Sequence, residues 1–153
     1  MLHLQNVTLE NIAKRIKREK MRIVVYGAGM IGKIVAPDMI QRYGLLENID
    51  CYVDCDVRKQ GKYITIGDKP VKICSPTVLD SIAQNSILFI TNSNYSAVLA
   101  TLDENKHLNG MDAIIIPVMQ ALAVKERTNA TEIILRNYSE ELIPVSYTHL
   151  TLP

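Results

Sequence analysis

Short apolar runs alternate with longer amphipathic segments along most of the chain. The apolar runs have the length and composition of buried strands, and they cover residues 23–26, 49–54, 86–91 and 113–117. Apolar residues three or four positions apart predict a helix at about 30–43. Ser75 as a cap and Pro76 as the first helical residue predict a helix at 75–84, and a further helix is expected at about 95–105. Strands that alternate with helices indicate an α/β fold, with a doubly wound and mostly parallel sheet of about five strands.

One connection departs from this alternation. Residues 55–73 are too few and too rich in glycine and lysine for a crossover helix, so we expect a small β-hairpin flap after the second strand, with Gly67 and Asp68 in its turn. Pro37 falls inside the predicted helix at 30–43 and should kink it. Further helical patterns at 118–127 and 131–138 follow the last predicted strand.

Residues 1–20 are predicted to form a leader helix with a basic surface. Leu9, Ile12 and Ile16 share one helical face, and lysines and arginines surround that face. Such a helix either packs on the domain or contacts an anionic membrane surface or nucleic acid. We expect no nucleic-acid partner, because no aromatic side chain lies among these charges to stack on bases.

The composition favours one ordinary soluble domain. The chain has 153 residues, of which 48% are hydrophobic and 22% charged. No apolar run approaches the length of a membrane helix, so we expect a cytoplasmic protein, with peripheral contact at the inner membrane face through the basic leader as the alternative. Cys51, Cys55 and Cys74 are then interpreted as reduced core thiols.

Residues for catalysis or metal binding are sparse. His3, His107 and His149 are scattered along the chain, so no cluster has the spacing of metal ligands and we expect no metal. No nucleophile stands beside a base, and the Tyr-x-x-x-Lys pair of short-chain reductases and epimerases is absent. We therefore expect no catalytic residue in this chain.

The stretch RIVVYGAGMIGK, residues 22–33, carries glycines in the pattern Gly-x-Gly-x-x-Gly. A strand that ends there and a helix that begins there bring unpaired N–H groups and a positive helix dipole together, which favours a phosphate. The first glycine makes the tight turn, the second admits the phosphate, and the third lets helix and strand pack closely. The predicted contacts are Gly27, Ala28, Gly29, Met30, Ile31, Gly32 and Lys33. The alternative is a glycine turn with an empty site.

Two polar positions at strand ends extend this predicted site. Asp54 ends the second strand about where a ribose-binding carboxylate is expected, roughly 20 residues after the glycines. Asn92 follows the strand at 86–91, at the carboxyl edge of the sheet where ligands of α/β folds bind, and is a candidate contact to a base or sugar. Asp54 as a plain strand-end carboxylate and Asn92 as part of a turn that caps the next helix are the alternatives.

The glycine loop and the following VDCDVRKQGKYITIGDKPV together resemble the Rossmann-like nucleotide-sugar-binding domains of bacterial surface-polysaccharide enzymes. Such domains precede sugar acyltransferases, membrane-bound sugar dehydratases and some capsular glycosyltransferases. The resemblance covers about residues 21–116 and implies nucleotide contacts at Gly27, Gly29, Gly32, Lys33 and Asp54. It also implies a small-molecule ligand, either a UDP-type nucleotide-sugar or NAD.

The end of the sequence suggests a parent protein. The segment ELIP at 141–144 resembles the lead-in to capsular glycosyltransferases with a DXD motif, which implies a missing C-terminal catalytic domain. The final VSYTHLTLP, residues 145–153, resembles translated sequencing adapter. We therefore expect a leader at 1–20, a nucleotide-binding domain at 21–128, a helical linker at 129–144 and a non-native tail. The alternatives are an NAD-dependent reductase or epimerase, or a sugar acyltransferase, without its substrate half, and a structural docking domain without a ligand.

Overall fold

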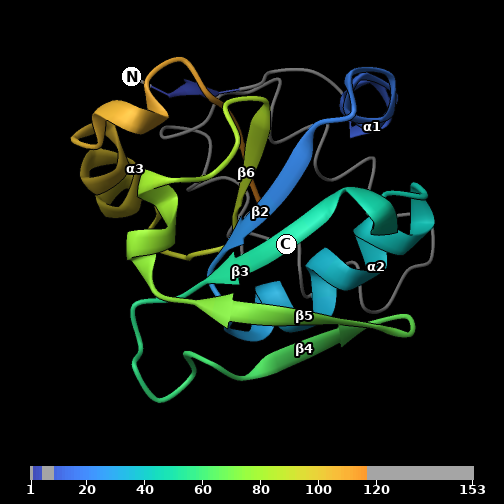
Figure 1. Cartoon of the computed structure of the whole chain (residues 1–153), viewed down its shortest axis with the longest axis horizontal. Coiled ribbons are helices and arrows are strands. Elements are labelled where there is room, and N and C mark those ends of the chain that lie inside the picture. The colour runs from blue at the N-terminus through green and yellow to red at the C-terminus, as the bar shows by residue number, and fades with distance from the viewer. Residues whose placement is uncertain (1, 5–8, 117–153) are drawn as a thin grey trace, which may run out of the picture.

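The computed structural model describes residues 2–4 and 9–116, which build one seven-stranded sheet (Figure 1). Its strands are β1 (His3–Leu4), β2 (Arg22–Tyr26), β3 (Ile49–Val53), β4 (Tyr63–Ile66), β5 (Lys69–Cys74), β6 (Ser86–Ile90) and β7 (Asp112–Ile115). They are ordered β1-β7-β6-β2-β3-β5-β4, and every neighbouring pair is parallel except β4 and β5. The helical patterns predicted beyond residue 117, the linker and the tail lie outside the described residues.

The strand order confirms the doubly wound α/β fold. The parallel sheet starts at β2 in its centre, grows outward through β3 to β5, and then continues on the other side of β2 with β6 and β7. Neighbouring strands β2 and β6 therefore lead to connections that run in opposite directions, which makes the gap between their carboxyl ends the topological switch point of the sheet. The short strand β1, which the sequence pattern did not predict, pairs with the outer edge of β7.

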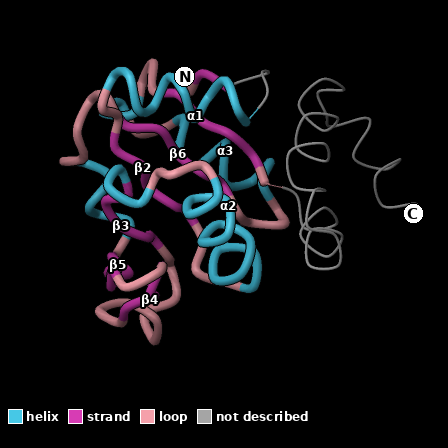
Figure 2. Tube along the Cα trace, turned by 90° about the vertical axis from the view of Figure 1, so that its right-hand side faces the viewer, coloured by secondary structure: helices cyan, strands magenta, loops and turns pink. Residues whose placement is uncertain are grey.

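Apolar side chains of the central strands alternate between the two faces of the sheet. Ile23 and Val25 belong to one buried cluster, while Val24 and Tyr26 belong to the other. Helices α1 (Leu9–Glu19) and α2 (Ala36–Arg42) cover the first face, and α3 (Tyr95–Asp103) covers the second (Figures 1 and 2). Because both faces are covered, the central strands read as continuous apolar runs rather than as alternating ones.

The predicted helix at 30–43 is divided into two parts. A π-helix at Ile31–Val35 leads into α2, which begins at Ala36. Pro37 has no N–H to donate to the carbonyl of Lys33, and its ring would clash with that carbonyl in a regular α-helix. The wider π-turn avoids this clash. Where the sequence predicts a kink, the structure changes from a π-helix to an α-helix at Ala36.

The predicted helix at 75–84 is shorter than expected. Only a 3-10 helix at Pro76–Asp80 forms, and the Ser75 hydroxyl caps it by accepting from the N–H of Thr77 at 3.2 Å. The helix ends at Ser81, whose backbone leaves the helical conformation with a φ of −132° and a ψ of 7°. The hairpin, in contrast, has Gly67 and Asp68 in its turn as predicted, because Ile66 pairs with Lys69 across a two-residue connection.

The amphipathic leader helix is part of the core. Leu9, Ile12, Ala13 and Ile16 are all buried against the first face of the sheet. On the same helix, the guanidinium of Arg15 lies 2.7 Å from the carboxylate of Asp112 at the start of β7. No helix in the described part of the chain is both long enough and apolar enough to cross a membrane.

Candidate functional site

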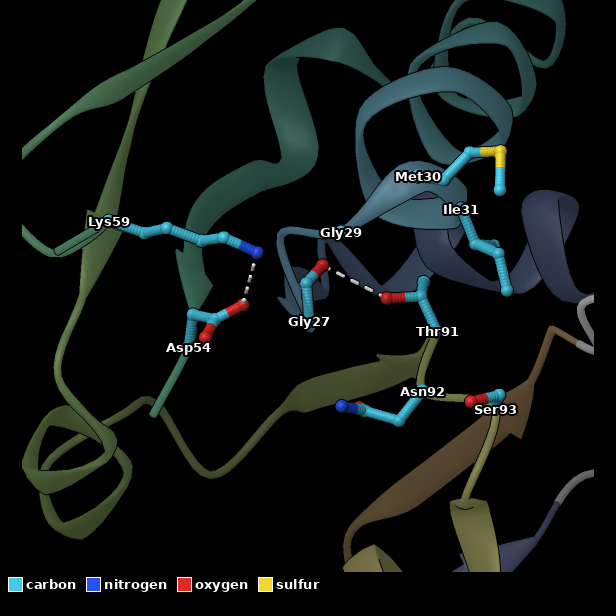
Figure 3. A pocket seen from close by; sticks show the side chains of 9 residues that line it. All are labelled: Gly27, Gly29, Met30, Ile31, Asp54, Lys59, Thr91, Asn92 and Ser93. Atoms are coloured by element: carbon cyan, nitrogen blue, oxygen red, sulfur yellow. Dashed lines mark hydrogen bonds and ion pairs between the residues drawn. The ribbon is translucent and has the colours of Figure 1, made fainter. Parts of the chain in front are cut away.

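A cleft of about 320 Å³ lies at the switch point, where the carboxyl ends of β2, β3 and β6 meet (Figure 3). The glycine loop forms its centre, the segment after β3 forms one wall, and the segment after β6 forms the other. Its lining residues are Gly27, Gly29, Met30, Ile31, Asp54, Lys59, Thr91, Asn92 and Ser93. Ligands of open α/β sheets bind at this place in the fold.

Two glycines of the loop are required by the chain itself. Gly27 has a φ of +113°, and a Cβ there would lie 2.5 Å from the hydroxyl oxygen of Thr91. A Cβ on Gly32 would overlap the carbonyl oxygen of Gly27. These positions make the tight turn and the close approach of helix to strand, as the sequence pattern predicts.

Gly29 is different from the other two. A Cβ built on it meets no atom within 4 Å, and its φ is not positive. Neither the turn nor the packing of the chain therefore requires glycine at this position. The residue is exposed and lines the cleft, so a side chain there would occupy space open to a ligand.

Asp54 holds the glycine loop in place. Its Oδ2 accepts a hydrogen bond from the N–H of Ala28 at 2.8 Å, and its Oδ1 accepts one from the N–H of Asp56 at 2.8 Å. The side chain is 15% exposed and faces the cleft (Figure 3). The sequence placed this carboxylate at the site but did not predict its bond to the loop. An ionised carboxylate has about four lone-pair positions, so lone pairs remain for ligand hydroxyls.

Polar groups after β6 form the opposite wall of the cleft. The hydroxyl of Thr91 is buried and lies 2.9 Å from the carbonyl oxygens of both Tyr26 and Gly27, which joins the end of β6 to the start of the loop. Asn92 lines the cleft, and its Oδ1 is buried with no hydrogen-bond partner in the described structure. Asn94 precedes α3 without a side-chain cap bond, so the capping alternative is not realised by that residue.

The remaining predicted loop residues divide into two groups. Met30 and Ile31 line the cleft, whereas Ala28 and Gly32 are buried behind it. Lys33 is exposed on the π-helix and is not among the residues that line the cleft. The first N–H groups of this helix have no acceptor within it, because the helical hydrogen bonds begin with the N–H of Lys33 to the carbonyl of Gly29 at 2.9 Å.

Sequence reasoning missed Lys59 and Thr91. Lys59 extends from the flap, residues 55–74, which comprise the turns after β3 and the β4–β5 hairpin. Its Nζ lies 3.9 Å from Oδ2 of Asp54. The signal for Thr91 was a hydroxyl that ends an otherwise apolar strand. Lys59 is the lysine of the flap motif VDCDVRKQG, but its reach to the cleft depends on how the flap folds.

Two ion pairs lie on the flap or join it to the end of β3. The guanidinium of Arg58 binds the carboxylate of Asp56 at 2.9 and 3.0 Å, and these hydrogen bonds lower the pKa of Asp56 to about 2. The Arg58 side chain is 87% exposed. It pairs with Asp56 and does not line the cleft. The second pair is Asp54 with Lys59, and it faces the cleft. Within the described ranges, no group of three or more His, Cys, Asp or Glu side chains is placed to hold a metal ion.

Comparison with known protein families and with curated proteins finds no match. Among solved structures, the chain is similar to the crystal structure of RSP, a Rex-family repressor, with 21% identity and a TM-score of 0.48 over 81% of this chain. A structure of RSP in complex with β-NAD⁺ and operator DNA aligns with 92% of this chain, with 21% identity and a TM-score of 0.44. The alignments span 66% of those chains, just under two thirds of their length.

The structure of RSP with operator DNA corrects one expectation from the sequence. The exclusion of nucleic acid as a partner is contradicted, because the repressor in that structure holds operator DNA. The lack of aromatic side chains among the leader's charges argues only against base stacking, whereas duplex phosphates are bound by lysine and arginine. The strand order and the glycine loop of this chain assign it a Rossmann-like fold.

Proposed function

We propose that this domain binds a nucleotide through its phosphate groups at the glycine loop. The observation that carries the proposal is Gly29, a glycine that neither the backbone conformation nor the packing of the chain requires. A glycine in such a place is explained by a ligand that approaches the backbone closely. The unpaired N–H groups at the start of the following helix are suited to bind the phosphate oxygens.

The walls of the cleft supply contacts for the rest of the ligand. Asp54 would accept hydrogen bonds from ribose hydroxyls, and Asn92 would contact the base or sugar. The volume of about 320 Å³ is at the lower end of the range for small-molecule sites, roughly 300–1,000 Å³, and suits one nucleotide unit. UDP, a UDP-sugar and the nucleotide half of NAD all meet these requirements.

For the parent protein we propose a glycosyltransferase of bacterial surface-polysaccharide synthesis, in which this domain binds a nucleotide or nucleotide-sugar without turning it over. The proposal rests on the resemblance of the loop and flap motifs and of the segment ELIP at 141–144. The segment ELIP is what favours it over a reductase or epimerase without its substrate half. The uninterrupted gene sequence beyond codon 144 tests it, and a reading frame without a DXD-bearing transferase domain would refute it.

Calorimetric titration with UDP, a UDP-sugar and NAD tests nucleotide binding, and the variants Gly29→Ala and Gly29→Val test the site. We expect the native domain to bind at least one of these ligands. Affinity should fall stepwise with the size of the new side chain, by at least tenfold, or about 1.4 kcal/mol, for valine. Thermal unfolding of both variants should stay close to native, because a Cβ at this position meets no neighbour within 4 Å.

Two outcomes would contradict the proposal. If the native domain bound none of the three ligands, the proposal of nucleotide binding would be refuted. Native-like affinity in Gly29→Val would remove the loop from the site.

A further inference from the structure

We propose that Lys59 binds a phosphate of the nucleotide and so joins the flap to the glycine loop when the cleft is occupied. The inference rests on the proposed function and adds a residue that the sequence pattern did not assign. It comes from the position of one ammonium group in the cleft (Figure 3).

The ammonium group of Lys59 lies at the cleft, and its N–H donors have no hydrogen-bond acceptor there. Its Nζ lies 3.9 Å from Oδ2 of Asp54, which is an ion-pair distance but too long for a hydrogen bond. Within the described structure the group makes no hydrogen bond, and its charge also helps to lower the pKa of the Asp56 carboxyl. Figure 3 shows the side chain extended from the flap, with its nitrogen near Asp54 and directed toward the glycine loop. Three N–H donors are therefore available to a ligand.

Asp54 does not need Lys59 as a hydrogen-bond partner. Each of its oxygens already accepts a backbone N–H at 2.8 Å, from Ala28 and from Asp56. With its carboxylate 15% exposed and the lysine side chain 33% exposed, the pair is shielded but not buried. A phosphate between the loop and Lys59 would replace a loose contact with charge-assisted hydrogen bonds, which are about twice as strong as neutral ones.

Lys59 is also the cation best placed for this role. Among the residues that line the cleft, it is the one with a positive charge. Arg58, its neighbour, is committed to Asp56 at 2.9 Å and is not part of the lining. Lys33, which the sequence pattern suggested as the phosphate cation, lies outside the lining as well.

The backbone around Lys59 is held in place before any ligand arrives. Its N–H donates to the carbonyl of Asp56 at 3.0 Å, and the side-chain amide of Gln60 donates to the carbonyl of Asp54 at 2.9 Å. The N–H of Gly61 donates to the carbonyl of Ile73 on β5 at 2.8 Å. These bonds fix the turn at both ends, so only the flexible side chain must adjust to reach a phosphate.

The pairing also changes what Asp54 would select. A lone carboxylate at this strand end repels a phosphate on the ribose 2′-hydroxyl, but a cation 3.9 Å away offsets that repulsion. The phosphate that Lys59 binds is therefore either the pyrophosphate of any nucleotide or a 2′-phosphate. Comparison of NAD with NADP distinguishes these two sources.

Calorimetric titrations of the whole chain with uridine, UDP, NAD and NADP test the inference in the native protein, in Lys59→Met and in Lys59→Arg. Lys62→Met is the matched control, because Lys62 is an exposed lysine of the same flap that does not line the cleft. For Lys59→Met we expect at least a tenfold loss of affinity for UDP or NAD, little change for uridine, and a weaker dependence on salt. Lys59→Arg should recover part of the loss, and the control should bind as the native protein does.

The outcomes separate the inference from the function on which it rests. A native protein that binds none of the phosphate-bearing ligands would refute the proposed function itself. Binding by the native protein with unchanged affinity in Lys59→Met would overturn the role of Lys59 and leave the function standing. Equal losses for NAD and NADP would assign the contact to the pyrophosphate, and a loss confined to NADP would assign it to the 2′-phosphate.

Discussion

At the scale of single residues, two cysteines at and after β3 have very different surroundings. Cys55 is exposed, and its Sγ lies 3.3 Å from the phenol oxygen of Tyr26, so the expectation of a core thiol is wrong for this residue. Cys51 is buried in β3, and burial raises the pKa of its thiol to about 12. Cys55 directly follows Asp54, which lines the cleft, so the exposed thiol lies close to the proposed ribose site.

We expect iodoacetamide at pH 8 to modify Cys55 rapidly and Cys51 hardly at all, as followed by mass spectrometry of peptides. Because the folded-state pKa of Cys51 is raised, its contribution to stability is present at neutral pH and is lost as the pH rises from about 9 toward 12. Cys51 should therefore become reactive only at alkaline pH or in denaturant. Equal rates for the two thiols at pH 8 would contradict this assignment.

The glycines and Asp54 could be predicted from the sequence because their roles depend on local spacing. A strand end, a tight turn and a helix start follow one another within a few residues, and the second strand ends at a fixed distance further on. Lys59 and the bond from Ala28 to Asp54 could not be predicted in the same way. The position of Lys59 depends on how the flap folds, and the bond from Ala28 to Asp54 depends on the pairing of β2 with β3, neither of which a local pattern encodes.

At the scale of elements, the β4–β5 hairpin depends on Gly67. This residue has a φ of +63° at the first position of a two-residue turn, while Asp68 has no positive φ, which indicates a type II′ turn. A Cβ there would also lie 3.2 Å from the side-chain nitrogen of Gln41 on α2. Gly67→Ala should lower the free energy of unfolding by about 1–2 kcal/mol.

Chemical denaturation followed by circular dichroism measures this change. Gly29→Ala is the matched control, because its φ is ordinary and its new Cβ meets open space. We expect the control to be at least as stable as the native protein. An equal loss in both variants would show that the turn conformation is not the cause.

Most elements could be predicted from the apolar pattern, and the exceptions have physical reasons. The two-residue strand β1 is too short to show a period. The spacing of apolar residues in the π-helix at Ile31–Val35 is the same as that expected for an α-helix. Only the clash at Pro37 favours the π-helix. The helix after Ser75 was predicted too long, because Ser75 and Pro76 mark where a helix begins but not where it ends.

At the scale of the whole molecule, one ion pair joins the leader helix to the far side of the sheet. Arg15 on α1 is 37% exposed, whereas Asp112 on β7 is 10% exposed, and their charged atoms lie 2.7 Å apart. Arg15→Met should lower the free energy of unfolding by about 1–2 kcal/mol, because it leaves a largely buried carboxylate without this cation. Asp112→Asn in the same chain should recover part of the loss.

A double-mutant cycle measured by chemical denaturation tests this coupling. Lys14→Met serves as the control, because the pair of Lys14 with Glu10 is exposed on both sides and should contribute less than about 0.5 kcal/mol. Additive effects of the Arg15 and Asp112 substitutions would show that the two side chains do not stabilise each other.

The position of β1 at the edge of the sheet constrains the order in which the chain can be assembled. His3 and Leu4 pair with Asp112 and Ala113, about 110 residues later in the chain. At roughly 5–20 residues per second on the ribosome, β1 leaves the exit tunnel several seconds before its partner strand has been synthesised. Of the described strands, the first to be synthesised therefore pairs with the last, and β1 has no partner strand until β7 has been made.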